Sequence, residues 1–115
     1  MHASTFKVRS KVWVENEAGK VIFGLGRFRM LETVDRLGSL QAAAKELKMS
    51  YRAIWSRIRA SEKRIGKTLL ISDNMGSRLT PLATSLVKQF RRLQTLVEQE
   101  SDEVYESLMA DRLAE

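Results

Sequence analysis

The stretch GSLQAAAKELKMSYRAIWSRIRASEKRIG, residues 38–66, constrains the fold more than any other part of the 115-residue sequence. Its apolar residues recur at the three- and four-residue spacing of a helix on both sides of a central break. Ser39 and Ser50 stand where side-chain oxygens cap helix N-termini. We therefore predict two helices, over residues 39–48 and 50–65, joined by a tight turn.

The flanking segments predict a mainly α-helical fold with small β elements. Alternating apolar and polar residues before NEAG, and a short apolar run, KVIFG, after it, favour an N-terminal β-hairpin over residues 6–24. A three-residue apolar period then predicts a helix over 26–37. The turn sequence SDNMG lies between TLLI and SRLT, which predicts a two-stranded ribbon over 68–80. Thr80 and Pro81 are suited to begin a final helix.

Three helices followed by a ribbon is the order of a winged helix-turn-helix. We assign residues 1–80 to this domain, and residues 81–115 to a long C-terminal dimerisation helix with an acidic tail. At about 1.5 Å per residue, the last helix extends for about 40 Å up to Leu108, further than a domain of this size can cover. We expect its distal apolar positions to pair with a second copy, which would make a homodimer.

The charge is unevenly distributed along the chain. The net charge is +6, but residues 98–115 hold seven acidic residues and one basic residue, a net charge of −6, so residues 1–97 carry +12. This distribution indicates a polyanionic partner, although a merely solvated basic face is the alternative. No apolar run of about 18 residues and no export pattern occurs, so we expect no membrane partner and a cytoplasmic location.

The residue content argues against an enzyme. The sequence has no cysteine, and its one histidine, His2, lies near the N-terminus. It also lacks a glycine-rich phosphate loop, a cluster of metal ligands and a nucleophile paired with a base. We predict no catalytic residue, no metal and no cofactor.

The third predicted helix carries the candidate nucleic-acid contacts. We expect Ile54, Ile58 and Ile65 to face the core. The helical period then turns five other side chains outward: Tyr51, Arg52, Trp55, Ser56 and Arg59. Arginine can bind guanine edges or phosphate, tyrosine and serine can donate to acceptors, and tryptophan can contact a thymine methyl or a sugar. The candidate set, with residues from the neighbouring elements added, is Ser39, Gln41, Ser50, Tyr51, Arg52, Trp55, Ser56, Arg59, Lys63 and Arg78.

Several of these candidates also have a structural interpretation. Trp55 can be half-buried against the ribbon or the hairpin, and Ser39 can serve only as a helix cap. Lys63 and Arg78 can be solvated charges without a partner. Gln41 lies at the start of a helix, where short polar side chains often hold a phosphate.

The motifs GS-x-x-AAA, MSYRAIW and LTP resemble the N-terminal DNA-binding domain of the molybdate-responsive regulator family ModE, which is similar to the LysR-type domain. The resemblance covers roughly residues 12–86. It implies a dimeric winged-helix transcriptional regulator that binds double-stranded DNA, with the hairpin packed on the domain and the last helix forming the dimer. The recognition positions of the family fall on the same five outward side chains of the third helix.

Two features depart from the family pattern. Lys48 stands where glycine is commonest, so we expect a left-handed or nearby backbone conformation there. Family members continue into domains that bind molybdate or tungstate, and this sequence ends where those would begin. Oxyanion binding therefore has no support in these residues.

We predict a sequence-specific, homodimeric DNA-binding transcriptional regulator that occupies a pseudo-palindromic operator. Two alternatives remain. The winged helix can be a protein-interaction module, or it can be a sequence-blind architectural DNA binder.

Overall fold

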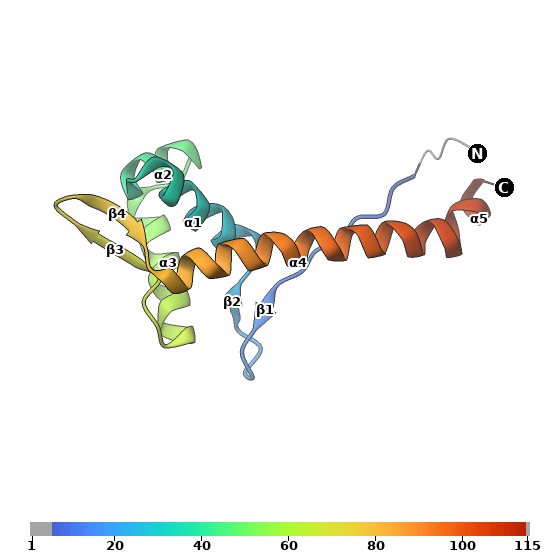
Figure 1. Ribbon diagram of the computed structural model, residues 1–115, viewed down its shortest axis with the longest axis horizontal. Coiled ribbons are helices and arrows are strands. Elements are labelled where there is room, and N and C mark those ends of the chain that lie inside the picture. Colours follow the sequence, from blue (N-terminus) through green and yellow to red (C-terminus); the bar gives the residue numbers. More distant parts are fainter. Residues whose placement is uncertain (1–5, 115) are drawn as a thin grey trace. The chain divides into compact units, whose positions relative to one another are not determined.

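The computed structural model describes residues 6–114, so His2 lies outside the described residues. The chain forms two compact units, Trp13–Phe90 and residues 6–12 with 91–114 (Figure 1). Helix α4 contributes to both. In chain order the elements are β1 (Val14–Glu15), β2 (Val21–Phe23), α1 (Leu25–Leu37), α2 (Leu40–Glu46), α3 (Tyr51–Ile65), β3 (Leu70–Asp73), β4 (Gly76–Leu79), α4 (Pro81–Tyr105), a π-helical turn η1 (Glu106–Ala110) and α5 (Asp111–Ala114). The described residues thus follow the predicted fold class.

The predicted helix caps between α1 and α3 are confirmed. Ser39 Oγ accepts a hydrogen bond from Ala42 N at 3.1 Å, and Ser50 Oγ accepts one from Ala53 N at 3.0 Å. Lys48 has the expected left-handed backbone, with φ of 56°. Helix α2 ends at Glu46 rather than at residue 48 because this conformation turns the chain out of the helix before α3 begins.

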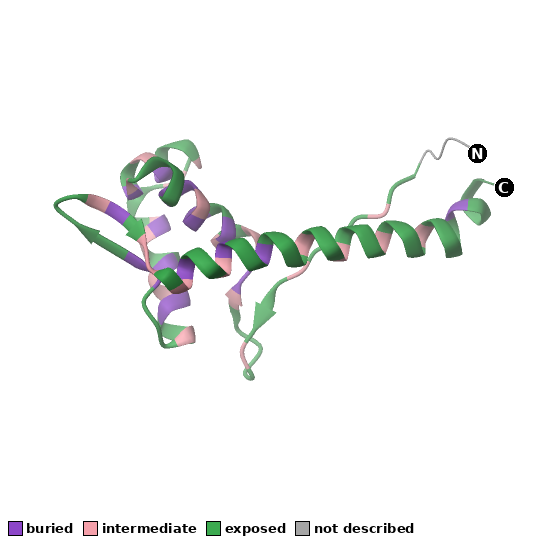
Figure 2. Cartoon of the chain, in the orientation of Figure 1, coloured by how far each residue is buried: buried purple, intermediate pink, exposed green. Residues whose placement is uncertain are grey.

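The core of the first unit lies where the three helices meet the wing. Leu31 of α1, Ile54 and Ile58 of α3, and Leu69 and Leu70 at the start of the wing are each at most 1% exposed. Figure 2 shows the buried positions on the inward sides of these elements. Burying an aliphatic side chain of this size contributes about 1.5–3 kcal/mol.

The prediction of a hairpin over residues 6–24 is wrong in its extent. Only β1 pairs with β2, antiparallel and with an irregularity in β1, and residues 6–12 form no strand. Helix α1 begins at Leu25, directly after β2, so no strand lies opposite residues 6–12. Their alternation of apolar and polar side chains therefore cannot form a sheet.

Strands β3 and β4 form the wing, pairing antiparallel from Leu70 with Leu79 to Asp73 with Gly76. The wing is fastened to the end of α1, because Ser77 N donates to Gly38 O at 3.1 Å. The backbones approach closely here: a Cβ atom built on Gly76 would lie 2.7 Å from Gly38 O.

Helix α4 begins as predicted at the Thr80–Pro81 step, with Thr80 Oγ1 accepting from Ala83 N at 3.2 Å. Within the first unit its buried residues include Val87 and Phe90. The Phe90 ring packs edge-on against that of Phe23, with 5.2 Å between centroids.

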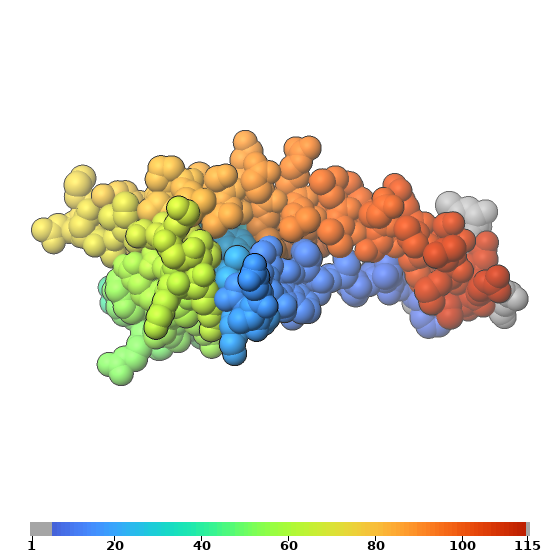
Figure 3. All heavy atoms as spheres, turned by 90° about the horizontal axis from the view of Figure 1, so that it is seen from below, coloured from blue at the N-terminus to red at the C-terminus, as the bar shows by residue number. Residues whose placement is uncertain are grey.

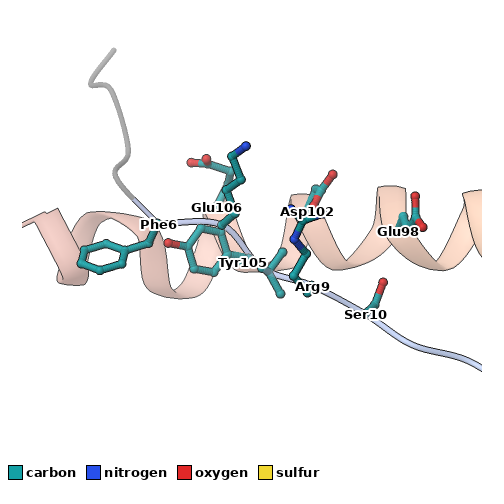
Figure 4. Close-up of a pocket in the computed structure, with 9 residues that line it drawn as sticks. Phe6, Arg9, Ser10, Glu98, Asp102, Tyr105 and Glu106 are labelled. Atoms are coloured by element: carbon teal, nitrogen blue, oxygen red, sulfur yellow. The ribbon is translucent and has the colours of Figure 1, made fainter.

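In the second unit, residues 6–12 lie along the distal part of α4, as the blue and red atoms of Figure 3 show. A cavity of about 460 Å³ is lined by residues 6–10 and by Glu98, Asp102, Tyr105 and Glu106 (Figure 4). The N-terminal segment brings Lys7 and Arg9 to this acidic part of α4, so opposite charges meet there.

Exposed apolar side chains recur along the distal part of α4 and in η1: Leu93, Leu96 and Val104 on α4, and Leu108 and Met109 in η1. In the described part of the chain, no helix has the length and apolar character required to cross a membrane.

Candidate nucleic-acid interface

Three side chains spaced one turn apart form a stacked row on α3. Tyr51 and Trp55 have nearly parallel rings, with an interplanar angle of 8° and 6.4 Å between centroids. The guanidinium carbon of Arg59 lies 4.1 Å from the centroid of the Trp55 ring. We call Tyr51, Trp55 and Arg59 the recognition ridge. Tyr51 is 50% exposed and Trp55 is half-buried, so the ridge reaches the surface of the helix.

Arg59 is anchored by Glu62, with which it forms an ion pair. Glu62 is only 8% exposed, and its Oε2 accepts hydrogen bonds from Leu69 N at 2.7 Å and Leu70 N at 3.0 Å. Burial alone would raise the pKa of Glu62, but these two bonds and Arg59 together hold that pKa below its ordinary value. The carboxylate therefore stays ionised and holds the guanidinium beside the indole.

The other candidates on α3 form a second row beside the ridge. Arg52, Ser56 and Lys63 are all exposed. At the helical period they lie on the side opposite the buried Ile54 and Ile58. The described part of α3 therefore presents cations and a hydroxyl next to an aromatic surface.

The candidates outside the helical part of α3 occupy two kinds of position. The hydroxyls of Ser39 and Ser50 accept backbone N–H groups as helix caps, and Gln41 is exposed on α2. Arg78 is exposed on the wing, where its Nη1 lies 2.9 Å from Asp73 Oδ2. The hydrogen bond from Met75 N and the ion pair with Arg78 lower the pKa of Asp73.

Arg27, which the sequence analysis did not single out, supports α3 from α1. Its Nε donates to the buried Ser61 Oγ at 2.7 Å. Burial lowers the pKa of Arg27, as do the positive charges of Arg57 and Arg64. Arg64 in turn donates to Val21 O at 2.8 Å, which joins α3 to the hairpin.

No local signal in the sequence identifies these supporting contacts. Arg27 and Ser61 are 34 residues apart, and Arg64 bonds a backbone carbonyl 43 residues away. In the sequence, Glu62 is one of only two acidic residues between Lys48 and Arg92, and that count alone does not mark its role. The one indication of its role is that Glu62 follows Ile58 by one helical turn. An acidic residue near the buried side of a helix requires hydrogen-bond partners.

Together the fold and this surface define a winged helix-turn-helix protein, with the first turns of its third helix exposed and rich in groups that bind nucleic acid. Residues 25–84 match the family described as bacterial regulatory helix-turn-helix proteins of the lysR family. The match covers more than half of the chain, and the chain belongs to this family of DNA-binding transcriptional regulators.

Known proteins are similar to the same part of the chain. A probable RuBisCO transcriptional regulator of Emiliania huxleyi is 29% identical over 77 residues, which are 67% of this chain and 24% of that protein. The chain thus spans about a quarter of the length of that relative.

Two solved structures share the fold. The DNA-binding domain of CbnR in complex with DNA has a TM-score of 0.62 and 25% identity, covering 74% of this chain and 98% of that one. ArgP from Mycobacterium tuberculosis has a TM-score of 0.57 and 25% identity, covering 72% of this chain and 31% of that one. The CbnR similarity connects the fold described above with a domain that was solved on DNA.

Proposed function

We propose that this protein is a homodimeric regulator that binds one specific DNA sequence with α3 in the major groove. The observation that carries the proposal is the exposed α3 surface, where the recognition ridge lies beside Arg52 and Ser56. Aromatic edges, guanidinium groups and hydroxyls are the groups that read base edges and hold phosphates. The similarity to a CbnR domain solved with DNA supports the same conclusion.

The dimer is part of this proposal. Exposed apolar side chains recur along distal α4 and η1, where Leu96 of α4 is 53% exposed and Leu108 of η1 is 63% exposed. Pairing two such helices would bury this surface. Two copies of α3 about 34 Å apart would then read successive major grooves, which predicts a pseudo-palindromic operator.

The dimer is tested with Leu96→Ser combined with Leu108→Ser, and with Gln99→Ser as the matched control. Gln99 is an exposed polar residue of the same helix. Sedimentation equilibrium is expected to show a dimer for the parent and the control, and a monomer for the double variant. A double variant that remains dimeric would place the interface elsewhere.

Within the LysR family, we propose closer kinship to the molybdate-responsive regulators. The motifs GS-x-x-AAA and MSYRAIW support this, as does the hairpin that precedes the matched residues 25–84. A regulator of this kind acts on chromosomal DNA in the cytoplasm, and we propose no catalytic activity for it.

DNA recognition is tested by selecting duplexes from random DNA at moderate salt and footprinting the bound fragments. We expect one enriched, pseudo-palindromic sequence. Arg52→Ala is expected to weaken binding to that sequence at least tenfold, while Lys20→Ala, an exposed cation on the hairpin turn, leaves binding nearly unchanged.

The alternatives give different results in the same experiment. A protein-interaction module would retain no duplex, and an architectural binder would retain all duplexes equally. Either result would overturn the proposal. If the Arg52→Ala variant melts at a lower temperature but its folded fraction binds DNA normally, Arg52 is not part of the interface.

A further inference from the structure

The neighbours of Trp55 determine which of its atoms can meet a ligand. Arg59 lies against the indole, with its guanidinium carbon 4.1 Å from the ring centroid, and the Tyr51 ring is parallel to it. These neighbours come from the turns after and before Trp55, so they flank the ring along the helix. The indole therefore offers its edge, with the N–H group and the apolar C–H rim beside it.

The indole N–H of Trp55 is a donor that makes no hydrogen bond within the described residues. The other tryptophan behaves differently, since Trp13 Nε1 donates to Glu15 Oε2 at 2.7 Å. Trp55 is half-buried, and its indole edge carries this donor and an apolar rim that no ring contact of Tyr51 or Arg59 uses. A matching ligand carries an acceptor beside an apolar group.

Thymine is the one base that presents this pair in the major groove, as the O4 acceptor beside the 5-methyl group. Resting on the proposed function, we propose that the edge of Trp55 reads a thymine of the operator. The rim contacts the methyl group, and the N–H lies toward O4. Arg59 and Glu62 are positioning residues, which hold the indole in this orientation.

The contacts of Arg59 favour positioning over direct reading. Its guanidinium is paired with Glu62, a carboxylate that is 8% exposed and fixed by the backbone of Leu69 and Leu70. A chain of contacts therefore runs from the start of the wing to the indole. Among the described residues Arg52 forms no ion pair of this kind, and its side chain is exposed. It is the better candidate for a base or phosphate contact.

The reading of thymine is tested on the selected duplex by replacing each thymine in turn with deoxyuridine, which removes only the methyl group. Burying one methyl group corresponds to about a fourfold change in affinity. We expect this loss at one thymine, or one symmetric pair, for the parent protein. Trp55→Ala is expected to bind more weakly and to show no loss at that position. If no thymine is sensitive, or if Trp55→Ala keeps the sensitivity, the proposal is overturned.

The positioning role is tested by comparing Arg59→Ala with Arg52→Ala as a matched control. Loss of a phosphate contact lowers the slope of log affinity against log salt by about one. We expect Arg52→Ala to lower the slope and to keep the methyl sensitivity. Arg59→Ala is expected to keep the slope and to lose the sensitivity. The reverse result for Arg59 would make it a phosphate contact and overturn its assignment.

Two further variants distinguish loss of the positioning role from loss of folding. Arg59→Lys keeps a charge for Glu62 but removes the planar guanidinium, so it is expected to reduce the methyl sensitivity at an unchanged melting temperature. Glu62→Gln keeps an oxygen for the wing backbone and weakens the hold on Arg59, with the same expected result. Full methyl sensitivity in both folded variants would refute the positioning role.

Failure of this inference differs from failure of the proposed function. If the protein selects a sequence but no 5-methyl group affects its affinity, the thymine contact is refuted and the proposed function stands. If it selects no sequence, both are refuted.

Discussion

At the scale of single residues, Glu62 controls the recognition ridge from the buried side of α3. Its carboxylate accepts the N–H groups of Leu69 and Leu70 and pairs with Arg59. Removing an acceptor from a buried N–H group costs about 1–3 kcal/mol. One side chain thus joins the wing to the exposed surface of α3.

Glu62 also predicts how stability depends on pH. Its pKa in the folded protein is below the ordinary value of 4.5, so its contribution is fully present above that value and is lost as the pH falls through the folded-state pKa. We expect the free energy of unfolding to fall less steeply below pH 4.5 in Glu62→Gln than in the parent. Denaturant titrations from pH 7 to pH 3 measure this difference, and parallel curves would contradict it.

Lys48 provides a second prediction at this scale. Its φ of 56° costs a residue with a side chain about 1–2 kcal/mol, while glycine loses about 0.5–1 kcal/mol more backbone entropy on folding. We expect Lys48→Gly to raise the free energy of unfolding by about 0.5–1 kcal/mol without DNA. Lys45→Gly, inside α2, is the control and is expected to lower it by about 1 kcal/mol. Destabilisation by Lys48→Gly would contradict the strain.

The sequence predicts which candidate residues are exposed but not which partners they have. The helical period of α3 places Arg52 and Ser56 on the surface, as the structure does. Trp55 is half-buried, but its ring contacts are Tyr51 and Arg59 of the same helix and not the wing or the hairpin. The pairing of Arg59 with Glu62, and of Arg78 with Asp73, depends on side-chain geometry that residue spacing does not fix.

At the scale of elements, helices were predicted more accurately than the hairpin. Helix ends depend on local signals such as Ser39 and Ser50, so α1, α2 and α3 begin within one residue of the prediction. A strand requires a partner supplied by another segment. Because β2 stops where α1 begins, residues 6–12 alternate like a strand and form none. The wing was predicted because its turn and both of its strands are adjacent in the sequence.

The contact between the wing and α1 gives a prediction for β4. In Gly76→Ala, the new Cβ would meet Gly38 O at 2.7 Å, and φ of 110° adds strain. We expect the free energy of unfolding to fall by about 2 kcal/mol or more. Gly19→Ala is the control, since its φ is 78° but no atom lies within 4 Å of a Cβ there. Gly19→Ala is expected to lower the free energy of unfolding by about 1 kcal/mol. Equal losses in the two variants would contradict a close approach between Gly76 and Gly38.

At the scale of the whole molecule, the uneven charge predicts how the proposed affinity for DNA depends on salt. Arg52, Arg57 and Lys63 are exposed on α3, so a dimer that places all three near phosphates neutralises about six of them. Release of their counterions predicts a slope of log affinity against log salt of about −5. Fluorescence anisotropy titrations at salt concentrations from about 50 to about 300 mM measure this slope. A slope shallower than about −2 would contradict a phosphate-bound α3.

The wing is tied down at both ends of its strands, at Gly38 through Ser77 and at Glu62 through Leu69 and Leu70. These bonds hold the wing against α1 and α3, so in the proposed DNA complex we expect the double helix to make the shape adjustment where it meets the wing. We then expect operators with easily kinked pyrimidine–purine steps to be favoured, even at base pairs that no side chain touches.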